Sequence, residues 1–159
     1  LAGWFVEQWG DPVETGVEGL THLFPSARVL SRQDGDRLRM PRTRGRALVG
    51  LCRALDEGGV MLDRSADRDD VRRAMVALPG IGPWTADYVA LRALGHPDVF
   101  LPTDVGVRHA LAALGREPAQ AEELARAWRP WRSYAQMHLW HSGAGGTGAH
   151  QGGKDPSGP

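Results

Sequence analysis

Glycine and proline divide most of this 159-residue chain into short segments with the spacing of helices. The clearest segment starts at Pro41 and ends at Gly58, and apolar residues recur along it every 3.6 positions. They are Ala47, Leu48, Leu51, Cys52 and Leu55. The same reading predicts helices over residues 1–9, 25–31, 67–78, 83–94, 102–114, 118–128 and 130–141. The only strand-like run, residues 99–101, is too short for a sheet, so the sequence predicts an all-α fold.

The residues from 142 to 159 are rich in glycine and serine and almost free of aliphatic side chains. Such a segment buries too little apolar surface to offset the entropy of ordering it. We therefore expect one helical domain over residues 1–141 and a disordered tail over 142–159. The single cysteine, Cys52, excludes a disulfide within the chain and a four-cysteine iron–sulfur site. The single lysine, Lys154, lies in the tail, which nearly excludes a catalytic amine from the folded part.

The most specific local pattern is Leu-Pro-Gly-Ile-Gly-Pro-Trp-Thr-Ala at residues 78–86. Two helices joined by this run make a tight hairpin, because Gly80 and Gly82 can take backbone angles that are closed to other residues. The backbone N–H groups at the start of the second helix suit a phosphate oxygen. The carbonyl groups that end the first helix suit a monovalent cation. From these residues alone, a plain turn between helices is the alternative.

This hairpin resembles the helix-hairpin-helix motif of a superfamily of DNA glycosylases. Four further blocks, residues 20–26, 40–42, 98–104 and 128–135, resemble DNA-3-methyladenine glycosylase II in the same order. The resemblance covers about residues 1–141. It implies the helical domain of a helix-hairpin-helix DNA glycosylase, which acts in base excision repair. The expected reaction is hydrolysis of the N-glycosidic bond of alkylated purines such as 3-methyladenine in duplex DNA.

Asp104 is the candidate catalytic residue. It follows Pro102 and Thr103 at the start of a predicted helix, whose positive end favours the carboxylate anion. An anion there can stabilise the positive charge that develops on the sugar, and it can orient or deprotonate water. The alternative is a simple helix N-cap. The resemblance implies the catalytic role.

Aromatic residues supply candidates for holding an extruded base. Trp84 and Tyr88 are four residues apart and share a helix face, and the resemblance places them with Trp140 in the base pocket. Electron-rich rings attract a cationic base. Their alternative role is core packing, which is also the role expected for four other tryptophans: Trp4, Trp9, Trp128 and Trp131.

The resemblance also assigns roles around the hairpin. Backbone donors to a DNA phosphate are expected at Gly80, Gly82 and Thr85. No cofactor is required, but a structural K+ or Na+ would be held by the carbonyl groups of Val76, Leu78 and Ile81. Relatives that also cut the backbone use a lysine just after the hairpin to form a Schiff base. That position is Trp84 here, so we expect base release without a lyase step.

Five arginines crowd residues 37–46: Arg37, Arg39, Arg42, Arg44 and Arg46. They either contact phosphates or form the solvated face of a helix, and the second reading is favoured because only some of them can point the same way. The net charge is zero, so binding to DNA must be local.

The expected partner is duplex DNA with alkylated bases, bound by a monomer in the cytoplasm and associated with the nucleoid; no membrane is involved. Complete proteins of the resembled family have an N-terminal β-rich domain and a preceding helix with a residue that wedges into the duplex. Neither lies within these residues, so we expect this chain alone to bind DNA weakly and to excise slowly. Two alternatives stay open: a non-catalytic helix-hairpin-helix module that grips DNA in a repair protein, and a helical interaction domain unrelated to DNA.

Overall fold

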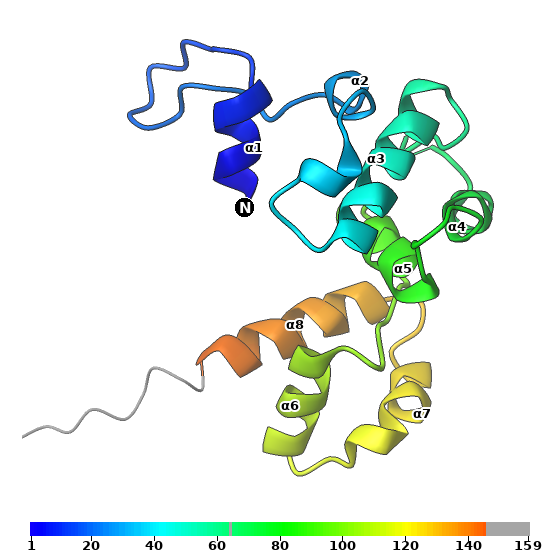
Figure 1. Ribbon diagram of the computed structural model, residues 1–159. Coiled ribbons are helices and arrows are strands. Elements are labelled where there is room, and N and C mark those ends of the chain that lie inside the picture. Colours follow the sequence, from blue (N-terminus) through cyan, green and yellow to red (C-terminus); the bar gives the residue numbers. More distant parts are fainter. Residues whose placement is uncertain (64, 146–159) are drawn as a thin grey trace, which may run out of the picture. The chain divides into compact units, whose positions relative to one another are not determined.

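The computed structural model describes residues 1–63 and 65–145, and this part of the chain is helical (Figure 1). The α-helices are α1 (Ala2–Trp9), α2 (Ala27–Leu30), α3 (Arg42–Asp56), α4 (Arg68–Val76), α5 (Pro83–Arg92), α6 (Val105–Ala113), α7 (Ala121–Arg126) and α8 (Arg132–Gly145). Two 3-10 turns, η1 (Gly35–Arg37) and η2 (Pro118–Gln120), lie between them. The β-type pairing in the described residues is an isolated bridge between Pro12 and His22. The all-α prediction is confirmed.

The chain forms two compact units, Leu1–Ala86 and the residues from Asp87 onward, where the sequence predicted one helical domain. The division falls within α5. The predicted tail also begins too early, because α8 continues through residues 142–145. A helix can extend past its last buried residue as long as its local hydrogen bonds form. Residues 146–159 of the predicted tail lie outside the described residues. Each helix of the described part is too short or too polar to cross a membrane.

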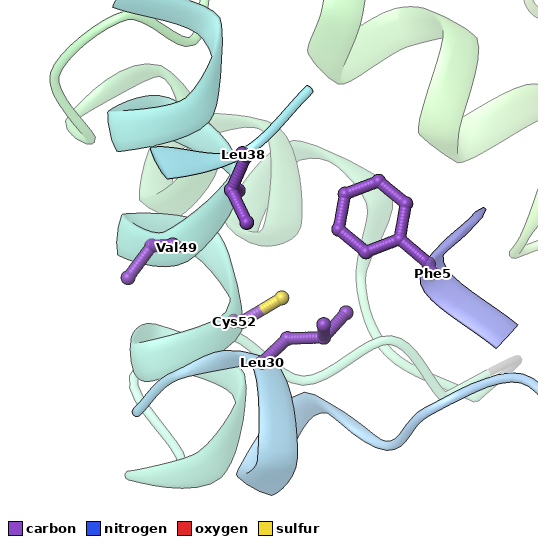
Figure 2. Packing of buried hydrophobic residues seen from close by; sticks show 5 residues of the cluster. All are labelled: Phe5, Leu30, Leu38, Val49 and Cys52. Carbon is purple, nitrogen blue, oxygen red and sulfur yellow. The ribbon is translucent and has the colours of Figure 1, made fainter. Parts of the chain in front are cut away.

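The first unit is built around a core that α1, α2 and α3 share. Figure 2 shows Phe5 pointing from α1 toward Leu30 of α2, with Cys52 of α3 beside them. Leu38 and Val49 complete this buried cluster. Trp4 and Trp9 pack against it, and their rings meet edge to face with centroids 5.1 Å apart, so their predicted core role is confirmed.

The second unit has its own core between α6, α7 and α8. Val107, Ala110 and Leu111 of α6 pack against Ala121 of α7 and Leu139 of α8. Trp128 packs against this cluster and contacts the edge of the Phe100 ring, as predicted.

The core role predicted for Trp131 is wrong, because its side chain is 59% exposed. Its ring packs edge to face on Tyr134, which is equally exposed. The next residue, Arg132, is the one that turns inward, toward Asp98. Neighbouring residues near a helix start point in different directions, so both cannot face the core.

Candidate active site

The segment that leads into α6 is held in place by polar side chains of α8. Ser133 Oγ accepts a hydrogen bond from the N–H of Val99, and Gln136 Oε1 accepts one from the N–H of Leu101, both at 2.9 Å. Ser133 and Gln136 are buried, and Gln136 is completely so. Buried backbone N–H groups need partners, so these two bonds fix the path of the chain just before Asp104.

An ion pair anchors the beginning of the same segment. The guanidinium of Arg132 binds both oxygens of the Asp98 carboxylate, and Nε of Arg129 also donates to Oδ2 at 3.2 Å. The hydrogen bond from Arg132 lowers the pKa of Asp98 to about 2. Asp98 is therefore ionised and paired at neutral pH. Together with Ser133 and Gln136, this pair ties residues 98–101 to α8.

Asp104 is the N-cap of α6. Its Oδ1 accepts a hydrogen bond from the backbone N–H of Val107 at 3.1 Å. The same oxygen accepts a second bond from the indole N–H of Trp140 on α8, at 2.8 Å. Within the described residues, Oδ2 takes part in no hydrogen bond. The residue thus caps the helix and, being only half-buried, keeps one carboxylate oxygen available.

Trp140, which contacts this carboxylate, packs against Tyr88 in the second unit. The two ring centroids are 6.0 Å apart, and the planes are inclined by 48°. Trp140 is half-buried and Tyr88 is 36% exposed. Trp140 therefore links two other predicted site residues, because it contacts Asp104 through its indole N–H and Tyr88 through its ring. Their arrangement offers an anion next to aromatic surface, which is what a cationic base on a sugar requires.

Gly106 makes the contact between Asp104 and Trp140 possible. A Cβ atom on this residue would lie 3.1 Å from Cδ1 of Trp140 and 3.2 Å from Oδ1 of Asp104. Both distances are shorter than ordinary contacts between such atoms, so any side chain at position 106 would push one of the two partners away.

Trp84 lies in the first turn of α5 and is 43% exposed. It belongs to the first unit, whereas Asp104, Tyr88 and Trp140 belong to the second. Its predicted contact with a base stays a prediction.

The hairpin connects α4 to α5 within the first unit. Gly80 has a φ of +82°, and a Cβ atom there would lie only 2.8 Å from Cβ of Ala47 on α3. Glycine is thus needed at position 80 both for its backbone angle and for its close packing. Gly82 differs from the prediction, because its φ is not positive and nothing lies within 4 Å of its Cβ position.

The groups predicted to bind phosphate and a cation lie along this turn. Val76 ends α4 and Pro83 starts α5. The carbonyl oxygen of Leu78 accepts the N–H of Ile81 at 3.1 Å. Thr85 lies in the first turn of α5 and lines a groove shared with Gly80 and with the start of α3.

The arginine stretch is largely engaged within the protein. Arg46 makes two hydrogen bonds to Asp36, at 2.6 and 2.7 Å, and holds the pKa of that carboxyl below its ordinary value. Arg37 pairs with Asp34, and the guanidinium of Arg39 lies 5.3 Å from the centre of the Trp4 ring. Arg44 is exposed and forms no ion pair within the described part of the chain. It lines the same groove as Gly80 and Thr85.

Three residues that shape this site were missed by sequence reasoning: Gly106, Ser133 and Gln136. The two polar residues and Trp140 occur at positions i, i+3 and i+7, which is one face of a helix. A polar residue on a helix face is usually expected to be exposed to solvent. The only sequence signal for burial was that Ser133 and Gln136 share their face with the apolar residue Trp140. Nothing in the sequence marked Gly106, since its partner on α8 is 34 residues away.

The chain is similar in sequence to bacterial DNA-repair proteins. The chain is 43% identical over 142 residues to the "Probable bifunctional transcriptional activator/DNA repair enzyme AlkA" of Mycobacterium tuberculosis, covering 87% of this chain and 28% of that protein. It is 38% identical over 122 residues to DNA-3-methyladenine glycosylase 2 of Escherichia coli, covering 75% and 43%. The chain thus spans less than half the length of these relatives. No family model matches it.

Solved structures show the same fold. A 3-methyladenine DNA-glycosylase from Archaeoglobus fulgidus superposes with a TM-score of 0.72 at 24% identity, over 88% of this chain and 50% of that one. The 8-oxoguanine glycosylase/lyase of Clostridium acetobutylicum, in complex with double-stranded DNA, gives 0.71 at 17% identity, over 90% and 52%. The described chain therefore has the helical fold of the DNA glycosylases.

Proposed function

Over most of its length this chain is homologous to one part of the DNA-3-methyladenine glycosylases, and from that relationship we propose that its protein excises alkylated purines from duplex DNA. The reaction is hydrolysis of the N-glycosidic bond of bases such as 3-methyladenine. One observation assigns this reaction to specific residues. The carboxylate of Asp104 lies at the start of α6 in contact with the indole of Trp140.

Asp104 would act on the sugar. As the bond to the base breaks, positive charge develops on the sugar ring, and a fixed carboxylate nearby stabilises it. The same group can orient the water that attacks the sugar or take its proton. An N-alkylated purine carries positive charge and leaves readily, so one carboxylate and little acid catalysis are sufficient.

The aromatic rings would hold the base. A base that has been turned out of the duplex needs a surface on which to stack. Tyr88 and Trp140 offer such a surface next to Asp104. A cationic base gains about 0.5–2 kcal/mol per ring from cation–π attraction, whereas a neutral base gains less.

The hairpin would grip the DNA backbone. The positive φ of Gly80 shapes the turn, and the N–H groups of Gly80, Gly82 and Thr85 are the proposed donors to a phosphate oxygen. The carbonyl group of Val76 ends α4, and those of Leu78 and Ile81 lie in the turn, where the Leu78 oxygen also accepts the N–H of Ile81. They would hold a K+ or Na+ ion, whose charge would strengthen the attraction for phosphate.

The proposed enzyme is monofunctional. A lyase step needs an amine that forms a Schiff base with the sugar, and the position after the hairpin is Trp84. The sole lysine is Lys154. We therefore propose base release without strand cleavage. The partner is duplex DNA, bound by a monomer in the cytoplasm where the nucleoid lies.

The test is to incubate the protein with methylated duplex DNA and to separate the released bases by chromatography. We expect 3-methyladenine among the products, no release from unmethylated DNA, and no strand breaks before alkali treatment. If the protein binds duplex DNA with a steep salt dependence but releases no base, the non-catalytic DNA-binding module is the correct function. If it does neither at low salt, the DNA-related proposal is wrong.

A further inference from the structure

We propose that Trp140 is a positioning residue as well as a stacking surface, an inference that rests on the proposed function. Its indole N–H holds Oδ1 of Asp104, so that Oδ2 is the oxygen presented to the sugar. Gly106 is the second element of this arrangement, because it leaves the space that the contact needs. The two residues together fix the orientation of the catalytic carboxylate.

The first argument is that two donors converge on one oxygen. Val107 N–H approaches Oδ1 at 3.1 Å along α6, and Trp140 Nε1–H approaches it at 2.8 Å from α8. A carboxylate held by a single cap bond can still rotate about its Cβ–Cγ bond. A second donor from a separate helix removes that freedom and leaves Oδ2 without a donor among the described residues. Its charge is then available to a developing sugar cation.

The second argument is that α8 itself is held in register with the segment before Asp104. Ser133, Gln136 and Trp140 lie on one face of α8, and each bonds to this segment, at Val99, Leu101 and Asp104 respectively. Gln136 is completely buried and Ser133 nearly so. The bond from Trp140 is thus the last of three hydrogen bonds that set the position of α8 relative to residues 99–104. These bonds couple the position of the indole to that of the carboxylate.

The third argument is steric and concerns Gly106. Gly106 lies in the first turn of α6, two residues after Asp104. A Cβ atom there would meet both Trp140 Cδ1 and Asp104 Oδ1 at 3.1 and 3.2 Å. Alanine at this position would therefore lengthen the Trp140–Asp104 contact or turn the carboxylate. The absence of a side chain is a condition for the positioning.

The experiment compares two variants with two matched controls. Trp140→Phe keeps an aromatic ring but removes the N–H donor, and Gly106→Ala adds the obstructing methyl group. Trp128→Phe removes an indole N–H that is not among the donors to Asp104 in the described residues. Gly50→Ala adds a methyl group inside α3 where nothing lies within 4 Å. All four are measured with methylated duplex DNA and excess protein, which separates the rate constant for base release from the protein concentration that gives half-saturation.

We expect Trp140→Phe to lower the rate constant by about 10²-fold, the effect of a small misplacement of a catalytic group. Gly106→Ala also lowers the rate constant for base release. In both variants the protein concentration that gives half-saturation stays that of the wild type. Both controls keep the wild-type rate constant. If Trp140→Phe keeps the wild-type rate constant, or if only its half-saturating concentration rises, Trp140 serves only as a stacking surface for the base.

An NMR measurement separates this inference from the proposed function. The indole N–H resonance of Trp140, identified by its loss in Trp140→Phe, should shift in Asp104→Asn and in Gly106→Ala but not in Gly50→Ala. An unchanged resonance in Asp104→Asn overturns the contact, even if the wild type releases base. A wild type that releases no base overturns the proposed function and the positioning role with it, whatever the resonance shows.

Discussion

The guanidinium of Arg132 binds the carboxylate of Asp98 by two parallel hydrogen bonds, with Nε–Oδ1 and Nη2–Oδ2 distances of 2.5 and 2.9 Å. Nη2 also donates to the backbone carbonyl of Asp98 at 2.8 Å. Both side chains are mostly shielded from solvent, with exposures of 20% for Arg132 and 15% for Asp98. The pair therefore differs from an ordinary surface salt bridge, and it joins the start of α8 to the segment that leads to Asp104.

This pair predicts a specific dependence of stability on pH. The pKa of Asp98 is lowered from 3.8 to about 2, so the pair contributes its full stability above pH 3.8 and loses it as the pH falls toward 2. Asp98→Asn should lower the free energy of unfolding at pH 7 by about 2 kcal/mol, because hydrogen bonds to a charged group are lost. It should also flatten the fall in stability between pH 4 and pH 2.

Denaturant unfolding at several pH values checks this prediction. The control is Asp34→Asn, which removes a pair with Arg37 in which both side chains are well exposed. Exposed pairs contribute little, so this control should unfold like the wild type. Equal losses in the two variants would contradict the role given to Arg132.

The hairpin gives a second prediction, on stability. Gly80→Ala places a side chain at a φ of +82° and a Cβ atom 2.8 Å from Cβ of Ala47. The backbone angle alone costs roughly 1–2 kcal/mol, and the contact adds to it. Gly58→Ala is the matched control, because Gly58 has a φ of +79° with nothing within 4 Å of its Cβ position. Thermal unfolding should show a larger loss at position 80 than at position 58, and equal losses would mean that the packing against α3 does not matter.

A buried glutamine gives a third prediction. Gln136→Met keeps the length of the side chain but leaves the N–H of Leu101 without its acceptor. An unsatisfied buried donor costs about 1–3 kcal/mol. The rate of base release should also fall, because the segment before Asp104 loses one of its ties to α8. Gln120→Met, at an exposed position in η2, serves as the control for both readouts. Base release at the wild-type rate in a destabilised Gln136→Met variant would show that the tie is structural only.

Particular residues show how far the sequence could predict this fold and site. Pro102 and Thr103 before Asp104 are a local signal for a helix start, and the N-cap of α6 lies there. The run of glycine and proline at residues 78–86 likewise located the hairpin and the need for glycine at position 80. Trp131 was misplaced because it lies just before the first residue of α8, where one position decides between core and solvent. Gln136 was missed because its partner is 35 residues away in the sequence.

The arginine stretch gives a fourth prediction, on binding to DNA. Arg44 is exposed, forms no ion pair among the described residues and lines the groove beside Gly80 and Thr85. Arg44→Gln should weaken binding to duplex DNA regardless of sequence and reduce the slope of log affinity against log salt by about 1. Arg28→Gln, which loses a pair with Asp56 elsewhere in the same unit, should leave the slope unchanged. Fluorescence anisotropy over a range of salt concentrations measures both, and identical slopes would remove Arg44 from the DNA interface.

The last prediction separates the two roles of Asp104. Asp104→Asn keeps an oxygen that can accept the N–H groups of Val107 and Trp140, so the cap of α6 is preserved while the negative charge is lost. Asp104→Ala removes both, and the lost cap should cost about 1 kcal/mol of stability. If the carboxylate stabilises the sugar cation, both variants should release base at least about 10²–10³ times more slowly than the wild type.

Thermal unfolding and single-turnover base release, measured on the same two variants, give four values that discriminate between the roles. A pure cap predicts that Asp104→Asn keeps both stability and base release, since an asparagine caps a helix as well as an aspartate does. A catalytic anion predicts that Asp104→Asn keeps stability and loses base release, and that both variants still bind duplex DNA. The charge and the cap reside on the same residue, but only the charge is needed by the chemistry, so asparagine at position 104 is the substitution that decides.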